Sequence, residues 1–448
     1  MRRIIPLLAF ALLAIAASAQ SGNLRAGAAR VDISPTPNMF PIPQGVQTLA
    51  DVHDPIYARA IVLDNGSTKV ALLSVDTAGM PNAGEAVQAI ADELKIPASN
   101  ISIASTHDHS TPTFGGGPNN NYDRKPYLEL MKKGVIEAAR QANAGLQPAR
   151  IGFATGKAYV NTNRDQKIGD SYKMGYAPEG PTDKTVDVIL ITNSAGTPIA
   201  VWSNYAVHGV VMFLSKTKDG KSEVNGDLPG WTARYVEDRM KGVVNVWTSG
   251  AAGDQNPLFM STYNQDAPDV HDEGAAGWGI LDVLSRRLGE EIVRVAGNIQ
   301  NTTDKAVLWG KDTSVTCPGR KFVASSAASA GMPNSPTSAP VTGAMIDSDP
   351  VVIPLGLIMI NDIAVANVSG EVFNEISQRL KKDSLFDRTA MATLVNGSLG
   401  YIPSENAYLL PSAMAAHNRV KPGCAEQQIV DAFVGLEKEY VPIWNAAH

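Results

Sequence analysis

Hydrophobic residues along this chain form two patterns, short strand-like runs and longer stretches with a helical period. The strand-like runs lie at residues 57–66 and 69–79, which form a predicted hairpin, and at 100–106, 186–193, 198–209 and 243–254. The helical stretches lie at residues 84–96, 127–145, 230–240 and 277–299. Because strands and helices alternate, the pattern predicts an α/β fold with mixed sheets flanked by helices.

Residues 325–345 interrupt this alternation. They are rich in Ser, Ala and Pro, which favours a long surface loop. The remaining sequence shows no linker and no internal repeat, and 44% of the chain is hydrophobic. Residues 20–448 are therefore expected to form a single large catalytic domain around a sizeable core.

The first residues of the chain predict export. A basic start is followed by an apolar run from Ile4 to Ala17, and Ala17-Ser18-Ala19 has the small-x-small form that signal peptidase cleaves. The run is shorter than the ~20 residues that a membrane-spanning helix needs, so a signal peptide over residues 1–19 is favoured over a retained anchor. We expect the mature protein to be secreted or periplasmic.

Net charge and cysteine content limit the kinds of partner and the cysteine states that are expected. The net charge of −6 offers no basic surface for nucleic acid. The chain has two cysteines, Cys317 and Cys424, which in an oxidising compartment form either one disulfide or two buried thiols. Their spacing does not decide between these states.

Two of the seven histidines, His107 and His109, follow the strand predicted at residues 100–106. Residues two apart in a strand point to the same side, so both imidazoles are expected to project together. Small residues follow from Ser110 onwards and leave room for a substrate. Paired imidazoles suit a metal ion, although two ordinary histidines beside a turn have the same spacing.

Other polar residues recur in the same setting. His208, Asp254, Asn256 and Glu371 each follow an apolar run and small turn residues. Taken singly, each also fits a structural role, such as a helix cap or a packed imidazole. Ligands of α/β proteins bind in the crevice at strand ends, so their recurrence predicts an active site there.

Several common catalytic patterns are absent from the sequence. It contains no G-x-S-x-G elbow, no H-E-x-x-H helix, no phosphate-binding loop and no dinucleotide fingerprint. The HDHSTP segment does not continue as the H-x-H-x-D-H of metallo-β-lactamase-like hydrolases, and two distant cysteines disfavour a thiolate site. Histidine and carboxylate ligands remain, and this set suits zinc with an open coordination position.

A series of short blocks along the chain resembles one known family. The blocks are AARVDISPTP, DPIYARAIVLDNG, ALLSVDTAGM, STHDHSTP, NTNRD, NYAVHG, NGDLPGW, GAAGDQNP, SGEVF, NGSLGYIPSENAY and PGCAEQQIVDA. In this order they resemble the catalytic N-terminal domain of the neutral/alkaline non-lysosomal ceramidases, from about Ala26 to about Leu436. No counterpart of the family's C-terminal immunoglobulin-like domain is expected, and the 325–345 loop has no clear counterpart.

The resemblance implies roles for particular residues. The family's zinc ligands fall on His107, His208, Glu371 and Tyr401. The residues that face the substrate amide and the oxyanion fall on His109 and Arg164, and Tyr408 corresponds to a further active-site tyrosine. Asn256 stands where the family has a serine in a GDVSPN-like block, which places any mechanism needing that hydroxyl in doubt.

The expected chemistry is hydrolysis by a zinc-activated water. His109 is expected to act as general acid because the ordinary pKa of histidine lies near working pH. Asp254 and Asn256 are expected to orient the substrate or to support the metal-bound imidazoles, with Asp76 and Asp227 as weaker candidates. Asp108 is expected to point to the opposite face and to be structural.

The primary hypothesis is a zinc-dependent hydrolase of an N-acyl bond, in ceramide or a related N-acyl lipid, with possible peripheral contact with membrane lipid. The alternatives are hydrolysis of smaller amides, esters or lactones at the same site, a (β/α)₈ amidohydrolase, and a non-catalytic metal-dependent binding module. Aromatic residues make up 6% of the chain and no exposed amphipathic helix is evident, so substrates smaller than ceramide stay open. Oligomeric state is not predicted.

Overall fold

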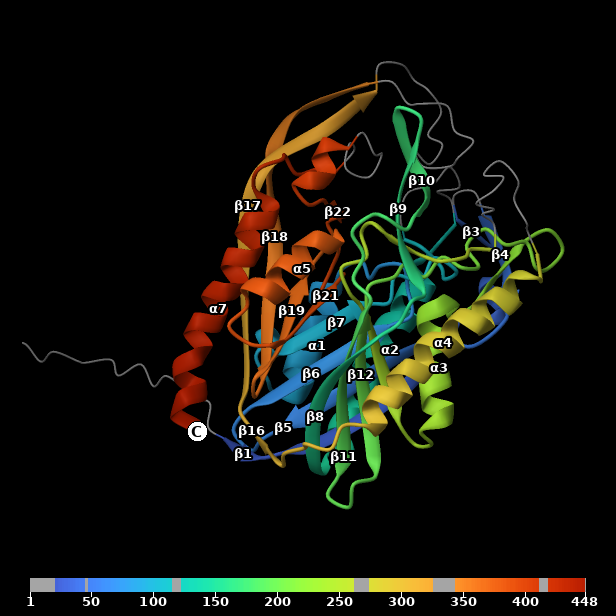
Figure 1. The fold of residues 1–448 in the computed structure, drawn as a ribbon. Helices are drawn as coiled ribbons and strands as arrows, with labels where there is room; N and C mark the ends of the chain where they lie inside the picture. The colour runs from blue at the N-terminus through green and yellow to red at the C-terminus, as the bar shows by residue number, and fades with distance from the viewer. Residues whose placement is uncertain are drawn as a thin grey trace, which may run out of the picture.

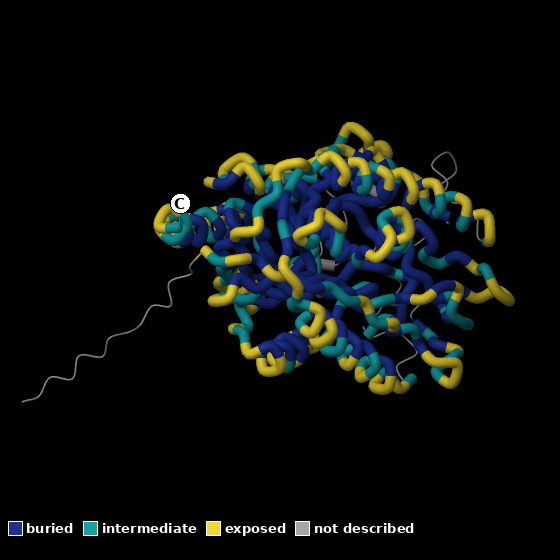
Figure 2. Tube along the Cα trace, turned by 90° about the horizontal axis from the view of Figure 1, so that it is seen from below, coloured by how far each residue is buried: buried dark blue, intermediate teal, exposed yellow. Residues whose placement is uncertain are grey.

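The computed structural model of the protein describes residues 21–44, 47–114, 122–261, 274–324, 343–410 and 418–447. Four-stranded sheets meet around a shared apolar core, and pairs of helices cover their outer faces (Figure 1). Figure 2 shows the buried interior enclosed by more exposed outer segments. The predicted α/β class, with mixed sheets flanked by helices, is confirmed.

The order β-β-β-α-β-α occurs three times in the described part of the chain. In each unit the first three strands of the sheet are antiparallel neighbours and the fourth is parallel to the third. The first and second units join edge to edge through a short antiparallel contact, so their strands count as one eight-stranded sheet. The sequence shows no repeat, and the repetition is one of topology.

The elements of each unit have the following bounds. The first unit contains β2 (Arg25–Asp32), β5 (Tyr57–Asp64), β6 (Lys69–Val75), α1 (Ala83–Leu94), β7 (Ile101–Ser105) and α2 (Lys125–Ala144). The second contains β8 (Gln147–Lys157), β11 (Thr185–Asn193), β12 (Pro198–Tyr205), α3 (Asp227–Arg239), β14 (Val244–Ser249) and α4 (Gly277–Gly297). The third contains β17 (Leu308–Ala324), β18 (Gly343–Ile360), β19 (Ile363–Val368), α5 (Asn374–Asp383), β21 (Arg388–Thr393) and α7 (Ala425–Ala447).

Shorter elements connect the units. The strands are β1 (Gly22–Asn23), β3 (Ile42–Gln44), β4 (Gln47–Val52), β9 (Asn161–Ile168), β10 (Ser171–Ala177), β13 (Ser222–Val224), β15 (Gln255–Pro257), β16 (Lys305–Ala306), β20 (Glu371–Val372) and β22 (Tyr401–Ile402). The 3₁₀ helices are η1 (Pro37–Met39), η2 (Ala98–Asn100) and η3 (Asn406–Leu409). Two of the small sheets that these strands form, β9–β10–β15 and β20–β22, carry residues of the site described below.

Alternation along each strand divides its side chains between two cores. In β5, Ile61 and Leu63 enter the core shared by the three sheets, whereas Ala60 and Val62 pack beneath α1 and α2. Trp202 of β12 and Ile358 of β18 enter the same shared core. At ~25 cal/mol per Å² of apolar surface, this common burial favours holding the three sheets together.

The predicted strands and helices correspond to observed elements, including the hairpin β5–β6. The (β/α)₈ alternative is wrong, because these strands form mixed sheets. The expected loop at residues 325–345 lies outside the described residues up to position 342, and its last three residues belong to β18. Residues 1–20, including the predicted signal peptide, also lie outside them.

The two cysteines form a disulfide, Cys317–Cys424, which ties β17 to the residue before α7. Their Cα atoms are 5.8 Å apart. Among the described helices, none combines the length and apolarity that a bilayer-spanning segment requires.

Candidate metal and catalytic site

The three units bring four ionisable side chains to one buried point. His107 and His109 follow β7, His208 follows β12, and Glu371 begins β20 after β19. The imidazole ligand atoms of the three histidines lie within 4.8 Å of one another. Glu371 Oε2 lies 3.1 Å from His107 Nε2 and 3.4 Å from His208 Nε2.

The two histidines of the H-x-H motif meet for a different reason from the one predicted. Strand β7 ends at Ser105, and His107 has a φ of 61°, so both imidazoles belong to a loop. His109 N donates to Gly209 O at 2.9 Å, and Gly209 N donates to His107 O at 3.3 Å. A Cβ on Gly209 would lie 3.0 Å from Asp108 Cα, so a glycine is needed where the two loops cross.

Backbone carbonyls fix the orientation of two imidazoles. Nδ1 of His107 lies 2.8 Å from Ala78 O, and Nδ1 of His208 lies 2.9 Å from Gln255 O. A carbonyl only accepts, so in each ring Nδ1 carries the proton and donates it. The neutral rings therefore direct the Nε2 lone pairs toward Glu371. The expectation that Asp254, Asn256, Asp76 or Asp227 supports these rings is wrong.

Glu371 is held beside Tyr401 by the parallel pair β20–β22. Its Oε2 is buried and accepts no hydrogen bond, although two imidazole nitrogens lie within 3.4 Å. Burial alone would raise the pKa of Glu371, but the neighbouring His107 and His208 hold it well below its usual range. The carboxylate is therefore ionised and can act as a metal ligand.

These residues fit a divalent cation. Two imidazole nitrogens and a carboxylate oxygen can all act as acceptors, and a divalent cation between them would satisfy all three. The orphaned Glu371 Oε2 is the observation that carries this conclusion. The donor set, two nitrogens and one oxygen, is one that zinc uses in catalytic sites.

Arg164, on β9, lines the site from the second unit. It is 3% exposed, and its Nη1 lies 3.5 Å from His208 Nε2 and 3.4 Å from Asn256 Oδ1. The guanidinium stacks on the ring of Tyr401 at 5.3 Å from the centroid. Burial opposes its charge, but Tyr401 and Glu371 raise the pKa of Arg164. Its buried Nε has no hydrogen-bond acceptor among the described residues.

His109 and Tyr401 are both neutral groups near pH 7. Burial, together with His107 and His208, holds the pKa of His109 well below its ordinary value. The ordinary pKa expected for His109 is therefore wrong, and its ring is neutral near pH 7 and binds a proton less readily than a free imidazole. Burial, reinforced by Glu371, raises the pKa of Tyr401 to about 12, so its phenol keeps its proton.

Asn256 lies in the site, on β15, and Arg164 Nη1 donates to its Oδ1. Its Nδ2 contacts Met260 Sδ at 3.5 Å. Asp254 lies on the adjoining turn, where its two oxygens accept hydrogen bonds from Asn163 and from the backbone of Asn374. Burial raises the pKa of Asp254 to about 7.

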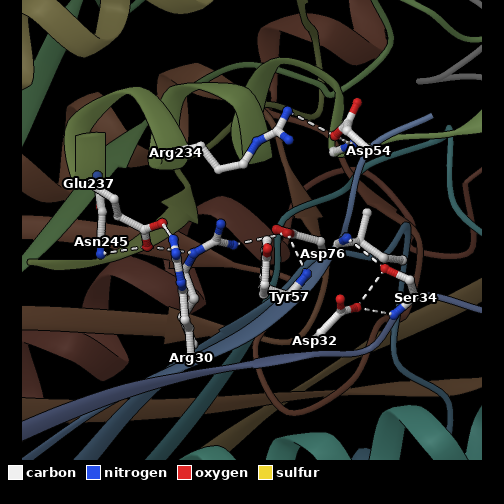
Figure 3. A network of polar contacts seen from close by, with 12 residues as sticks. Arg30, Asp32, Ser34, Asp54, Tyr57, Asp76, Arg234, Glu237 and Asn245 are labelled. Carbon is white, nitrogen blue, oxygen red and sulfur yellow. Dashed lines mark hydrogen bonds and ion pairs between the residues drawn. The ribbon is translucent and has the colours of Figure 1, made fainter. Parts of the chain in front are cut away.

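Asp76 belongs to a separate buried network, drawn in Figure 3. Arg59 lies between Asp76 and Glu237, with contacts of 2.9 and 3.0 Å. Asp76 Oδ2 also accepts a hydrogen bond from the backbone of Tyr57 at 2.9 Å. Burial would lower the pKa of Arg59, but the two carboxylates raise it, so this ion pair braces β5 against α3.

Asp227 and Asp108 are structural. Asp227 accepts hydrogen bonds from the backbone of Val211 and Met212, which fixes the segment after His208. Asp108 Oδ1 accepts from Ser110 N at 2.7 Å and shapes the H-x-H loop. Burial and Asp227 raise the pKa of Asp108 well above its usual value.

Tyr408 is not part of the histidine cluster. Its hydroxyl donates to Val420 O at 3.0 Å and contacts Asn418, and Arg320 stacks on its ring. These partners tie η3 to the long hairpin β17–β18. None of these contacts places Tyr408 beside the histidine cluster, and its role as an active-site tyrosine stays a prediction. The sequence did not predict that the backbone carbonyls of Ala78 and Gln255 orient the imidazoles, because residue type does not reveal the role of a carbonyl that every residue possesses.

Three comparisons relate this arrangement to known proteins. Residues 33–270 match the family model for neutral/alkaline non-lysosomal ceramidase, N-terminal. The fold is similar to that of neutral ceramidase from Pseudomonas aeruginosa, with a TM-score of 0.67 and 16% identity, covering 93% of this chain and 75% of that one. A structure of a ceramidase complexed with C2 has a TM-score of 0.68 at 16% identity, covering 93% and 76%.

Proposed function

Because the chain belongs to the neutral/alkaline non-lysosomal ceramidase family, we propose that it is a zinc-dependent hydrolase of the amide bond in ceramide or a related N-acyl lipid. The observation that carries this proposal is the convergence of His107 Nε2, His208 Nε2 and an orphaned Glu371 oxygen. That the similar solved structures are ceramidases supports the substrate class.

His107, His208 and Glu371 would hold the ion, and the family likeness adds Tyr401 as a weak neutral ligand. When bound, zinc supplies Lewis acidity, which lowers the pKa of a coordinated water to about 7 and polarises an acyl carbonyl. Since both imidazoles have Nδ1 committed to carbonyls, their Nε2 atoms need no rearrangement to act as ligands.

Arg164 would bind the acyl oxygen. Its guanidinium is buried, charged and held by Gly253 O, and its Nε is a donor without a partner. When water adds to the amide carbon, negative charge develops on the acyl oxygen, and a fixed cation in a buried site stabilises it. Removing one such donor typically costs about 10²- to 10³-fold in rate.

His109 would move the proton. Because its ring is neutral, Nε2 is free to accept the proton that water loses as its oxygen bonds to the acyl carbon. The same nitrogen then gives that proton to the leaving nitrogen as the carbon–nitrogen bond breaks. The products are a carboxylic acid and an amine, and the imidazole returns to its neutral form.

Asn256 takes no covalent part in this scheme. A side-chain amide is not a nucleophile, and its Oδ1 is already an acceptor for Arg164. We assign it the task of orienting Arg164 and the substrate amide. The attack by water makes the family's serine hydroxyl unnecessary in this chain.

Export to an oxidising compartment, with a signal peptide over residues 1–19, is part of the proposal. The Cys317–Cys424 disulfide supports it, because such bonds persist outside the reducing cytosol. Processing is tested by N-terminal sequencing of the protein recovered from culture medium or periplasm, where we expect the chain to begin at Gln20.

The activity is tested with a panel of N-acyl compounds, from short-chain amides to C12 ceramide. The wild-type protein is compared with His107→Ala, and zinc content is measured in each preparation. His53→Ala is the matched control, because His53 pairs with Asp54 and stacks on Trp278, outside the histidine cluster.

We expect ceramide cleavage by the wild type and by His53→Ala, with one zinc per chain, and loss of both zinc and turnover in His107→Ala. Zinc binding with cleavage of short amides or esters alone would refute the ceramide assignment and keep the mechanism. Zinc binding without any turnover would refute catalysis and favour a metal-dependent binding module.

A further inference from the structure

One short segment, the turn at residues 251–254 together with the start of β15 (called the turn below), touches several parts of the site. Gln255 O accepts the hydrogen bond from His208 Nδ1 at 2.9 Å. Gly253 O accepts a hydrogen bond from Arg164 Nη2 at 2.5 Å. The turn therefore contacts both a proposed metal ligand and the proposed oxyanion donor.

The same turn is bonded to the strand that carries Glu371. Gly253 N donates to Val372 O at 2.8 Å. A Cβ at Gly253 would lie 2.5 Å from Glu371 O and 2.8 Å from Phe373 Cδ1. The close approach requires glycine, and it leaves the backbone of the turn in direct contact with β20.

The side chain of Asp254 adds a second connection. It is 4% exposed, and each of its oxygens accepts one hydrogen bond of 2.9 Å. Oδ1 accepts from the backbone N of Asn374, the first residue of α5 and three residues after Glu371. Oδ2 accepts from Nδ2 of Asn163, which immediately precedes Arg164 on β9.

We propose that Asp254 is a positioning residue that sets the separation between Arg164 and Glu371, an inference that rests on the proposed function of these two groups. The two donors come from different units of the fold, and only a carboxylate offers an acceptor to both. An amide at this position accepts one of them and turns its NH₂ group toward the other. Asp254 itself touches neither metal nor substrate in this scheme.

The geometry explains why the separation matters. Arg164 must reach the acyl oxygen while Glu371 holds the metal, and these groups sit on β9 and β20, which do not pair with each other. The backbone of the turn contacts both strands, and Asp254 locks the turn against α5. Loss of the Asp254 contacts is therefore expected to change the separation between Arg164 and Glu371 while β9 and β20 both stay folded.

The test compares Asp254→Asn with the wild type in three measurements: zinc affinity by chelator competition, the visible spectrum of the cobalt(II) form, and the kcat and KM for a short-chain amide. Replacing a residue that supports the ligands of a metal site typically lowers metal affinity or activity by about 10- to 100-fold. We expect a fall of this size in zinc affinity and in kcat, a changed cobalt spectrum, and a nearly constant KM.

A reciprocal variant provides the rescue. In Asn163→Asp with Asp254→Asn, the amide at 254 donates to the carboxylate at 163, so the bond between the two side chains is restored in reverse. The Asn163 Nδ2 bond to Pro181 O, 3.1 Å long, is the one contact given up. We expect the double variant to recover most of the zinc affinity and kcat, and Asn163→Asp alone to lose more than Asp254→Asn.

Asp187→Asn is the matched control. Asp187 is 2% exposed and binds Lys381 at 3.0 Å, so this change also alters a buried carboxylate on the second unit. We expect it to lower thermal stability and to leave the zinc affinity and cobalt spectrum of the folded protein unchanged.

Wild-type zinc affinity and kcat in Asp254→Asn would overturn the proposal. So would a loss that the reciprocal variant fails to recover, or an equal loss in Asp187→Asn, since both outcomes describe a general structural defect. If no variant and no wild type cleaves any amide, while the affinities follow the expected order, the positioning role stands and the proposed hydrolysis fails.

Discussion

Replacing Glu371 by glutamine is expected to leave the metal-free protein nearly as stable as the wild type and to destabilise the metal-bound protein. In the metal-free protein, Glu371 Oε2 is a buried acceptor that faces imidazole nitrogens 3.1 and 3.4 Å away. A buried unsatisfied acceptor costs about 1–3 kcal/mol, and a net hydrogen bond contributes about 1 kcal/mol. The NH₂ group of glutamine can donate to a lone pair on either ring, but the variant loses the carboxylate charge beside the buried Arg164, so the two effects oppose each other and metal-free Glu371→Gln is expected to differ from the wild type by about 1 kcal/mol at most.

The metal-bound protein should lose stability. At a free zinc concentration of about 1,000 times the wild-type Kd, binding adds about 4.1 kcal/mol to the free energy of unfolding. Even a residue that only hydrogen-bonds to a metal ligand typically changes the metal affinity by about 10- to 100-fold when it is replaced. A loss of about 100-fold leaves zinc at about 10 times the Kd of the variant, where binding adds about 1.4 kcal/mol.

The assay is urea unfolding with and without zinc at one fixed free concentration. Glu375→Gln is the control, because it makes the same charge change in the first turn of α5, where the carboxylate accepts from Ser404 and Asn406. This control should lose stability equally in both conditions and keep a zinc effect of about 4.1 kcal/mol. A Glu371→Gln protein that still gains the full zinc effect would refute the ligand role of Glu371.

Three further changes test other parts of the structure. Arg164→Lys keeps a cation but loses the planar fork, so kcat for a short amide is expected to fall by about 10²-fold or more while zinc content stays at one per chain. Replacing Cys317 and Cys424 by serine opens a loop with a sequence separation of 107, which is worth about 4.7 kcal/mol in urea unfolding, with zinc binding retained in the folded protein. Lys381→Met leaves the buried Asp187 without its cation and should cost about 3–5 kcal/mol at pH 7. Burial already raises the pKa of Asp187, and losing Lys381 raises it further, so the folded variant binds a proton that the unfolded chain releases. Unfolding measured at pH 7 and pH 4 should therefore show a smaller deficit at the lower pH.

Apolar periodicity predicted the elements whose burial is one-sided or complete. Strand β6 is buried along nearly its whole length, and α2 turns a row of small and apolar residues toward the sheet. The hairpins β9–β10 and β17–β18 escaped prediction because polar and exposed positions interrupt them, as at Ile168 and Val323, which are 40% and 45% exposed. The threefold repetition of topology could not be predicted from the sequence, because it is maintained by packing and not by repeated residue identities.

Site residues could be predicted from the sequence where the side chain itself supplies the functional group. His107, His208 and Glu371 each follow a buried strand and small residues, and the structure brings them together. The partners of the imidazoles were not predictable, because Ala78 and Gln255 act through backbone carbonyls that every residue possesses. The structure does not bring Tyr408 to these residues, because its hydroxyl bonds to the segment after residue 417, and its role stays a prediction.

The H-x-H motif shows why a correct outcome can follow from an incorrect local argument. Strand alternation was expected to place His107 and His109 side by side, but the strand ends before either residue. The left-handed conformation of His107 and the crossing with Gly209 turn the two rings toward each other instead, with their Nε2 atoms 3.2 Å apart. Contacts with the second unit, not the strand, therefore create the pair.

The ligands are distributed so that no single unit holds the set. His107 comes from the first unit, His208 from the second and Glu371 from the third, and the units meet through the shared core, the β2–β8 pairing and buried ion pairs. A metal that binds all three ligands binds the assembled domain and not its separate parts, so its binding energy adds to the stability of the assembly. Loosening the shared core should then weaken zinc affinity even when every ligand is intact, because the cost of bringing the three sheets together is subtracted from the energy of binding.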